Sequence, residues 1–130
     1  MASAPDLVPE LVVDELDLIR RAVPVAGADL LDLGCGDGAM ARRLAAAGAR
    51  VTAVEVNAAS IAPDPAVTVI EGRAEALPLA SAGFDAVLML KSLHHVPVAG
   101  MEAGLREVAR VLRPGGLLFC WEPVFAGPFN

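Results

Sequence analysis

The stretch LLDLGCGDGAM, from Leu30 to Met40, decides how this chain is organised. Residues 30–33 are mostly apolar and predict a short strand, whereas Ala39 to Ala47 predict a helix. Between them, Gly34, Gly36 and Gly38 alternate with Cys35 and Asp37. Glycines let the backbone turn sharply and leave no Cβ between the backbone amides and a ligand. The start of the helix adds unpaired N–H groups, so the stretch predicts a site for a nucleotide-like ligand.

The composition indicates one globular domain over residues 1–130, because 55% of the chain is hydrophobic and only 20% is charged. A net charge of -6 argues against a nucleic-acid partner and favours a small molecule. No apolar run approaches the roughly 20 residues of a membrane span. The first residues carry Asp6 and Glu10 and have no apolar signal core, so we expect a cytoplasmic protein without a membrane partner.

Cysteine usage points to no metal. Cys35 and Cys120 are too few and too far apart for a zinc site or a disulfide framework, and two reduced thiols are expected. Cys35 is interpreted as the small residue that a glycine loop needs, rather than as a nucleophile.

The rest of the chain alternates predicted strands and helices. Apolar periodicity predicts helices over Asp6–Val23 and Pro97–Leu112. The second helix has an apolar stripe of Val98, Met101, Leu105, Val108 and Leu112. Further strands are predicted over Arg50–Val56, Val67–Glu71, Phe84–Lys91 and Leu117–Trp121, with a helical turn or two in 57–62 and a loop over 72–83. Arg113-Pro114-Gly115-Gly116 is interpreted as a structural helix stop. This order predicts an α/β fold, with an open, mainly parallel sheet of about five strands and helices on both faces.

Two carboxylates mark the predicted ligand site. Asp32 precedes the glycine loop, where its charge would oppose a pyrophosphate but suit a sulfonium and an ammonium group. The loop also fits the dinucleotide pattern with Gly34, Gly36 and Ala39, so a nicotinamide cofactor stays open as a disfavoured alternative. Glu55 ends the second strand, where a carboxylate can accept both ribose hydroxyls of either ligand.

Four segments in order carry a family resemblance: LDLGCGDG, VTAVEVN, EGRAEALPLASAGFDAVLMLKSLHHV and LREVARVLRPGG. Over about positions 28 to 122 the chain resembles class I S-adenosylmethionine-dependent methyltransferases, in the small-molecule branch related to quinone biosynthesis. The resemblance implies a Rossmann-like sheet, S-adenosyl-L-methionine as the cofactor, and methyl transfer to a small-molecule acceptor.

The resemblance also implies a set of site residues. It places the cofactor at Asp32, Gly34, Cys35, Gly36, Gly38, Glu55, Val56, Ala74, Glu75 and Lys91. In the family, an acid often stands where this chain has Arg73, which has donors only, so the adenine contact passes to the Ala74 backbone or to Glu75. The segment after the fourth strand borders the methyl group, and His94 or His95 is the candidate general base.

Family members usually continue past the fifth strand with a further helix and two strands, and we expect these to be missing here, because only Glu122–Asn130 follow that strand. We therefore expect Leu117–Trp121 to be an apolar sheet edge, covered in a homodimer or left by a shortened chain. A second hypothesis is a catalytically inert methyltransferase-like module that binds or dimerises.

Overall fold

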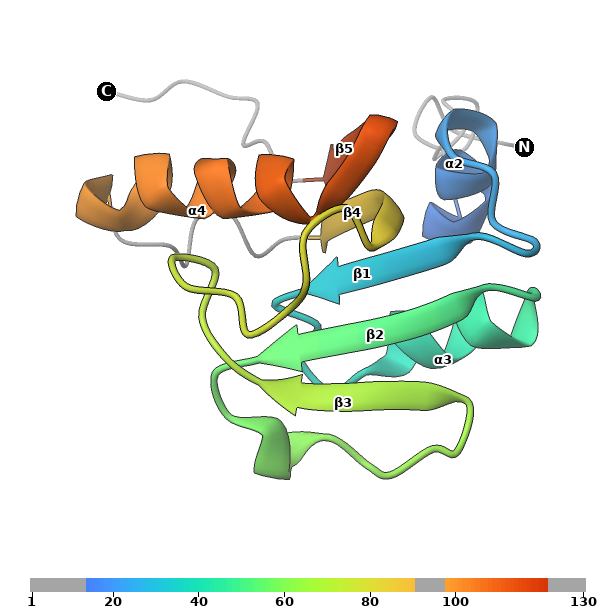
Figure 1. Ribbon diagram of the computed structural model, residues 1–130. Coiled ribbons are helices and arrows are strands. Elements are labelled where there is room, and N and C mark those ends of the chain that lie inside the picture. Colours follow the sequence, from blue (N-terminus) through green and yellow to red (C-terminus); the bar gives the residue numbers. More distant parts are fainter. Residues whose placement is uncertain (1–13, 91–97, 122–130) are drawn as a thin grey trace, which may run out of the picture.

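The structure is a computed structural model that describes residues 14–90 and 98–121. These residues form one five-stranded sheet in the order β3-β2-β1-β4-β5 (Figure 1). The strands are β1 (Asp29–Leu33), β2 (Arg50–Glu55), β3 (Val67–Glu71), β4 (Phe84–Leu90) and β5 (Leu112–Trp121). The helices are α2 (Glu15–Ala22), α3 (Ala39–Ala46) and α4 (Val98–Val111), with a short 3₁₀ turn η1 (Ala58–Ser60). Every neighbouring pair of strands is parallel, which confirms the predicted α/β sheet. No helix in these described ranges is long and apolar enough to cross a membrane.

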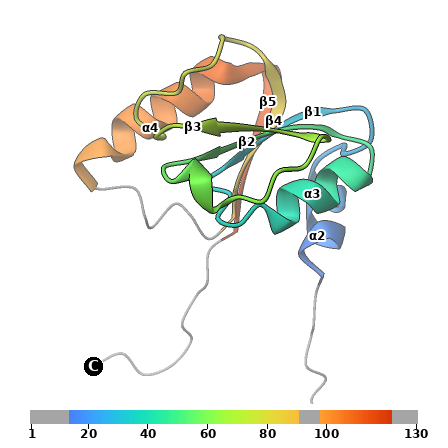
Figure 2. The same ribbon diagram turned by 90° about the horizontal axis from the view of Figure 1, so that it is seen from below.

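Helices cover both faces of the sheet, as predicted. Figure 2 shows α4 on one side and α2 and α3 on the other. On the α2–α3 face, Ile19 and Leu44 pack in one apolar cluster with Leu30. On the α4 face, Val108 packs in a second cluster with Leu31. Leu30 and Leu31 serve opposite clusters because successive side chains of a strand point to opposite faces.

The strands lie close to where the sequence places them. β3 is confirmed at both ends, and β1 begins one residue earlier than predicted, at Asp29. β2 ends at Glu55 rather than at Val56, which lies beyond the strand with 55% of its surface exposed. A parallel strand that is buried on both faces is a nearly continuous apolar run, so its position can be predicted from the local sequence alone.

The helix predicted over Asp6–Val23 is confirmed over Glu15–Ala22, but Asp14 and Val23 are not helical, so one continuous helix is wrong. Asp14 has an extended backbone, with φ -66° and ψ 123°, and its carboxylate accepts a 3.0 Å hydrogen bond from the Leu16 N–H. Asp14 is therefore an N-cap at which α2 begins. The helix ends before Val23, because a residue that precedes a proline disfavours the helical region. Residues 6–13 lie outside the described part of the chain.

The predicted apolar stripe of the last helix is also mostly wrong. Val98 and Leu105 are 90% and 43% exposed, and the buried face of α4 instead carries Gly104, Val108 and Val111. A Cβ placed on Gly104 would lie 3.5 Å from the Ala74 Cβ, which is an ordinary van der Waals distance. At this position α4 therefore packs against the loop that follows β3 through small residues. The helix is turned toward its small residue rather than toward its largest ones.

β5 begins at Leu112 and not at Leu117. Phe84 pairs with Leu112 and Ala86 pairs with Leu117, so residues 113–116 bulge out of the ladder opposite Asp85. Arg113 in this bulge donates to Asp85 Oδ1 at 2.9 Å and to Asp29 Oδ2 at 2.8 Å. The segment is structural, as predicted, but it joins the strand instead of preceding it. β5 is the outermost strand of the described sheet on its side.

Candidate functional site

The glycine loop after β1 has the backbone of a ligand cradle. Gly34, Gly36 and Gly38 have φ values of 74°, 59° and 82°, the left-handed region in which side chains other than hydrogen are strained. A Cβ built on Gly36 would meet no described residue within 4 Å, so the loop borders open space in the described structure. Gly38 is packed more tightly, because its Cβ would lie 3.0 Å from the Ile61 Cγ2. The side chain missing at Gly36 leaves room for a ligand against the backbone.

The end of β2 holds this loop in place. The Gly34 N–H donates to the Val54 carbonyl at 2.8 Å, and the Gly36 N–H donates to Glu55 Oε2 at 2.8 Å. Glu55 Oε1 accepts from the Val56 N–H at 3.2 Å. These bonds follow from the parallel register, which pairs Leu33 of β1 with Val54 of β2. Glu55 and the glycine loop, which the sequence predicts as two parts of one site, are therefore in direct contact.

The loop runs into α3 through a local cap. Asp37 Oδ1 accepts from the Ala39 N–H at 3.0 Å, and the Gly38 N–H donates to the Cys35 carbonyl at 3.0 Å. Arg42 Nη1 donates to the Asp37 carbonyl at 3.0 Å. A carboxylate at the start of a helix also interacts favourably with its dipole, so Asp37 fixes where α3 begins.

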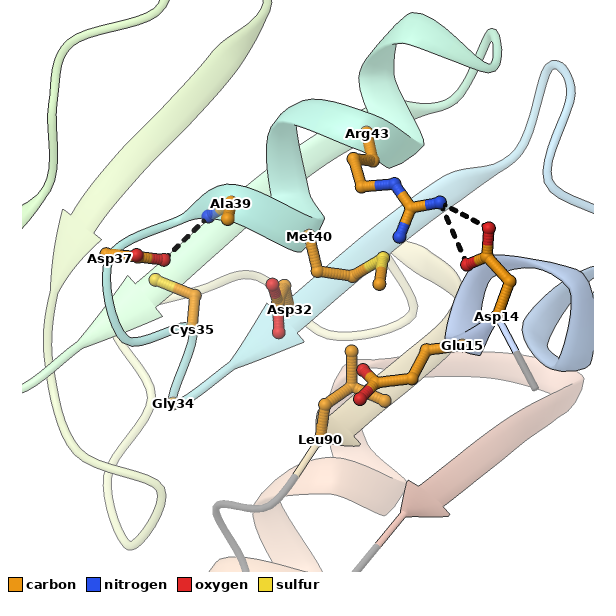
Figure 3. A pocket seen from close by; sticks show the side chains of 10 residues that line it. All are labelled: Asp14, Glu15, Asp32, Gly34, Cys35, Asp37, Ala39, Met40, Arg43 and Leu90. Carbon is orange, nitrogen blue, oxygen red and sulfur yellow. Dashed lines mark hydrogen bonds and ion pairs between the residues drawn. The ribbon is translucent and has the colours of Figure 1, made fainter. Parts of the chain in front are cut away.

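A pocket of about 530 Å³ lies between this loop, α2 and α3 (Figure 3). Its lining consists of Asp14, Glu15, Asp32, Gly34, Cys35, Asp37, Ala39, Met40, Arg43 and Leu90. Figure 3 shows Asp32 at its centre, with Cys35 to one side and Met40 to the other. The pocket opens beyond the carboxyl end of β1, which is where parallel sheets bind ligands.

Asp32 is the chemically distinctive group of this pocket. Its side chain is buried, with 1% of the residue exposed, and its Oδ1 has no hydrogen-bond partner among residues 14–90 and 98–121. Burial, together with the nearby charge of Glu55, raises the pKa of Asp32 to about 7. A buried carboxylate oxygen without a partner is costly, because it has lost water and gained nothing in return. An ammonium or another cationic donor from a ligand would supply the missing partner.

The pocket also contains a thiol, that of Cys35. Burial and the charges of Asp32 and Glu55 raise the pKa of Cys35 to about 12, so its thiol stays protonated and is a poor nucleophile. Within the described ranges, no group of three or more His, Cys, Asp or Glu side chains is placed to hold a metal ion.

Six other predicted residues, all of them in the described ranges, are not part of this lining: Gly36, Gly38, Glu55, Val56, Ala74 and Glu75. Gly36, Gly38, Glu55 and Val56 form the rim beside the loop and the end of β2. Ala74 and Glu75 follow β3, whose last residue Glu71 pairs with Glu55. Ala74 is buried against α4, and a Cβ on Gly100 of that helix would lie 2.7 Å from the Glu75 Cγ.

Three predicted residues cannot be placed in this geometry. Lys91, His94 and His95 lie outside the described residues, which include β4 up to Leu90 and resume at Val98.

Several residues of the pocket were not predicted from the sequence. Asp14 and Glu15 come from the start of α2, and Met40 and Arg43 come from α3. Asp14 accepts two hydrogen bonds of 2.8 Å from Arg43 Nη2, which joins the two helices. The acidic pair before Leu16 is typical of a helix start and could have signalled the cap, but not the contact with Arg43.

Comparison with known proteins gives one family. Residues 31–120 match the model of a family described as a methyltransferase domain. The chain is 38% identical over 109 residues to the ubiquinone/menaquinone biosynthesis C-methyltransferase UbiE of Rubrivivax gelatinosus, covering 80% of this chain and 43% of that protein. It is 34% identical over 116 residues to a ubiquinone biosynthesis O-methyltransferase of Xanthomonas oryzae, covering 80% and 46%. The chain thus spans less than half the length of these curated relatives.

The fold has solved counterparts as well. The crystal structure of a SAM-dependent methyltransferase from Methanosarcina mazei is 25% identical and superposes with a TM-score of 0.70, covering 82% of this chain and 57% of that one.

Proposed function

The chain belongs to the methyltransferase domain family, and we propose on this basis that it binds S-adenosyl-L-methionine and transfers the methyl group to a small molecule. The observation that carries the proposal is the unpartnered oxygen of Asp32, buried in a pocket beside an open glycine loop. When bound, the cofactor supplies a methyl group on a positively charged sulfur, which a nucleophile can take directly. The family match argues against the nicotinamide alternative.

The pocket would hold the amino-acid end of the cofactor. Asp32 would accept from the ammonium group, which restores the partner that its Oδ1 lacks. A charged donor also favours the ionised carboxylate, so binding would lower the raised pKa of Asp32. Gly34 and Cys35 line the same pocket, and the lack of a side chain at Gly36 leaves room for the ligand to pass the loop.

The adenosine end would lie along the rim. Glu55 accepts one hydrogen bond on each carboxylate oxygen, and each oxygen has a second acceptor position. The two ribose hydroxyls can take these positions without displacing the Gly36 N–H. Val56 is exposed next to Glu55 and would lie beside the adenine ring. Gly38, the Ala74 backbone and Glu75 complete this proposed half of the site.

The acceptor side of the proposal depends on residues after β4. Lys91 would border the cofactor, and His94 or His95 would take the proton that the acceptor loses. Methyl transfer needs little more than an in-line approach at roughly 3–3.5 Å, so positioning is the main task of the protein. Relatives named for ubiquinone and menaquinone biosynthesis make phenolic or quinol-like compounds the first acceptors to test.

Titration calorimetry with S-adenosylhomocysteine tests the cofactor, and incubation with labelled S-adenosylmethionine and an acceptor panel tests the transfer. We expect saturable binding and label in at least one acceptor. A folded protein that shows no heat would contradict the proposal. Binding without transfer to any acceptor would instead support the inert module as the function.

We also propose that the protein is cytoplasmic and that two copies pair along β5. Leu117 and Leu118 on this edge are 47% and 37% exposed, and an open apolar edge favours pairing. Light scattering should give the mass of a dimer, and Leu118→Lys should give the mass of a monomer. A wild-type monomer at high concentration would contradict the pairing.

A further inference from the structure

We propose that Arg43 recognises the carboxylate of the cofactor's amino-acid end, and that it exchanges its bond to Asp14 for this contact. The proposal rests on the proposed function, since it assigns a residue of the same site. Arg43 would then be a binding residue that makes the site specific for cofactors with an amino-acid tail.

The geometry leaves Arg43 with donors to spare. Asp14 takes only the Nη2 of Arg43, through both of its carboxylate oxygens. A guanidinium has five N–H donors in a planar fork, and no bond to Nη1 or Nε is recorded within the described residues. Figure 3 shows Arg43 reaching from α3 over the pocket that holds Asp32, with its second terminal nitrogen on the side of Met40. A ligand carboxylate in the pocket can therefore approach the guanidinium.

The charges of the pocket select an amino acid rather than a simple anion. Among the described residues that line the pocket, Asp14, Glu15, Asp32 and Asp37 carry carboxylates and Arg43 alone carries a cationic side chain. A phosphate would meet Arg43 at the cost of repulsion from the acids around it. An ammonium and a carboxylate on one carbon offer Asp32 and Arg43 an opposite charge each.

The exchange is inexpensive for the protein. Asp14 and Arg43 are 44% and 45% exposed, and exposed ion pairs contribute little to stability. If Arg43 turns to a ligand, Asp14 still accepts from the Leu16 N–H and keeps its role as the N-cap of α2. The start of α2 beside the pocket therefore does not depend on this ion pair alone.

Two ligands that differ only in the tail provide the test. S-adenosylhomocysteine carries the amino-acid group, and 5′-methylthioadenosine has the same thioether and adenosine without it. Titration calorimetry measures both against wild type and Arg43→Gln, with Arg21→Gln on the exposed side of α2 as the matched control. We expect Arg43→Gln to weaken the affinity for S-adenosylhomocysteine by about tenfold or more and to leave the affinity for methylthioadenosine unchanged. The reason is that a charged hydrogen bond is lost from one ligand only. Arg21→Gln should change neither.

The outcomes separate the two proposals. An equal loss for both ligands in Arg43→Gln would overturn the inference, since it would mean that Arg43 only shapes the pocket; so would no loss for either. If wild type binds neither ligand, the proposed function fails as well. Asp14→Asn keeps a good capping side chain and frees Arg43, so it should bind S-adenosylhomocysteine at least as tightly as wild type. A loss as large as that of Arg43→Gln would also overturn the exchange.

Discussion

Glu55, the last residue of β2, accepts a 2.8 Å hydrogen bond from the backbone N–H of Gly36 in the loop after β1. One carboxylate thus fixes the conformation of the loop and stands at the rim of the pocket around Asp32. The parallel pairing of β1 with β2 makes this possible, because it brings the two strand ends to the same edge of the sheet.

Changing Glu55 separates its two roles. Glu55→Ala removes the acceptor for Gly36 and for the ribose, and we expect cofactor binding to weaken by about 1–3 kcal/mol. Glu55→Gln keeps one acceptor oxygen in the same place and should lose less. Folding should change little, since the residue ends a strand. Calorimetry with S-adenosylhomocysteine measures the binding, and thermal unfolding checks the fold. Equal affinity in Glu55→Ala and wild type would show that the ribose lies elsewhere.

A pair of glycine substitutions tests whether the open space at Gly36 belongs to a ligand. Gly36 and Gly27 both have positive φ, 59° and 75°, and a Cβ at either would have no neighbour within 4 Å in the described part of the chain. Alanine should therefore cost each site a similar strain of about 1–2 kcal/mol. Only Gly36→Ala places a methyl group at the proposed site, so only this variant should have a weaker affinity for S-adenosylhomocysteine. The same affinity for both variants would exclude close contact between ligand and loop.

The raised pKa of Asp32 predicts how stability depends on pH. The ordinary value is 3.8 and the folded value is about 7, so the folded state keeps a proton that the unfolded state loses between these values. This term is fully favourable below about pH 4 and is lost as the pH rises through 7. Asp32→Asn has no such proton, and the ligand-free variant should gain stability over wild type as the pH rises. Denaturant unfolding at several pH values measures this. Parallel curves for the two proteins would contradict it.

The ion pairs of Arg113 predict the opposite trend in acid. Bonds from Arg50 and Arg113 hold the pKa of Asp29 at about 2, below its ordinary value of 3.8. Their stabilisation is present above the ordinary value and is lost as the pH falls through about 2. Arg113→Gln should therefore lower Tm by a few degrees near neutral pH and by less in acid. If Arg113→Gln lowers Tm by the same amount down to acid pH, then packing, rather than charge, holds the bulge of residues 113–116 in place.

Local signals explain what could be predicted from the sequence. The strands at Val67–Glu71 and Asp29–Leu33 are apolar runs bounded by turns, and the three glycines have the positive φ that their spacing indicates. Asp32 and Glu55 were identified because they stand at strand ends, where the topology of a parallel sheet places ligands.

Contacts between distant residues explain what could not be predicted. The buried face of α4 includes Gly104, which packs against Ala74 in the loop after β3. The apolar periodicity of the helix cannot predict this contact with a distant segment. The bond from Arg43 to Asp14 joins residues 29 positions apart, and its role in the pocket appears only when α2 and α3 lie together. A capping aspartate likewise overrode the apolar spacing that suggested a longer first helix.

The proposed function depends above all on the buried carboxylate of Asp32, which would bind the ammonium end of S-adenosylmethionine. Its most direct test is the affinity for S-adenosylhomocysteine, titrated by calorimetry into wild type and Asp32→Asn at about pH 8, where the wild-type carboxylate is mostly ionised. The nearly isosteric amide keeps the shape of the site and removes the charge. We expect binding to be at least about tenfold weaker in Asp32→Asn. Equal affinity in the two proteins would contradict it.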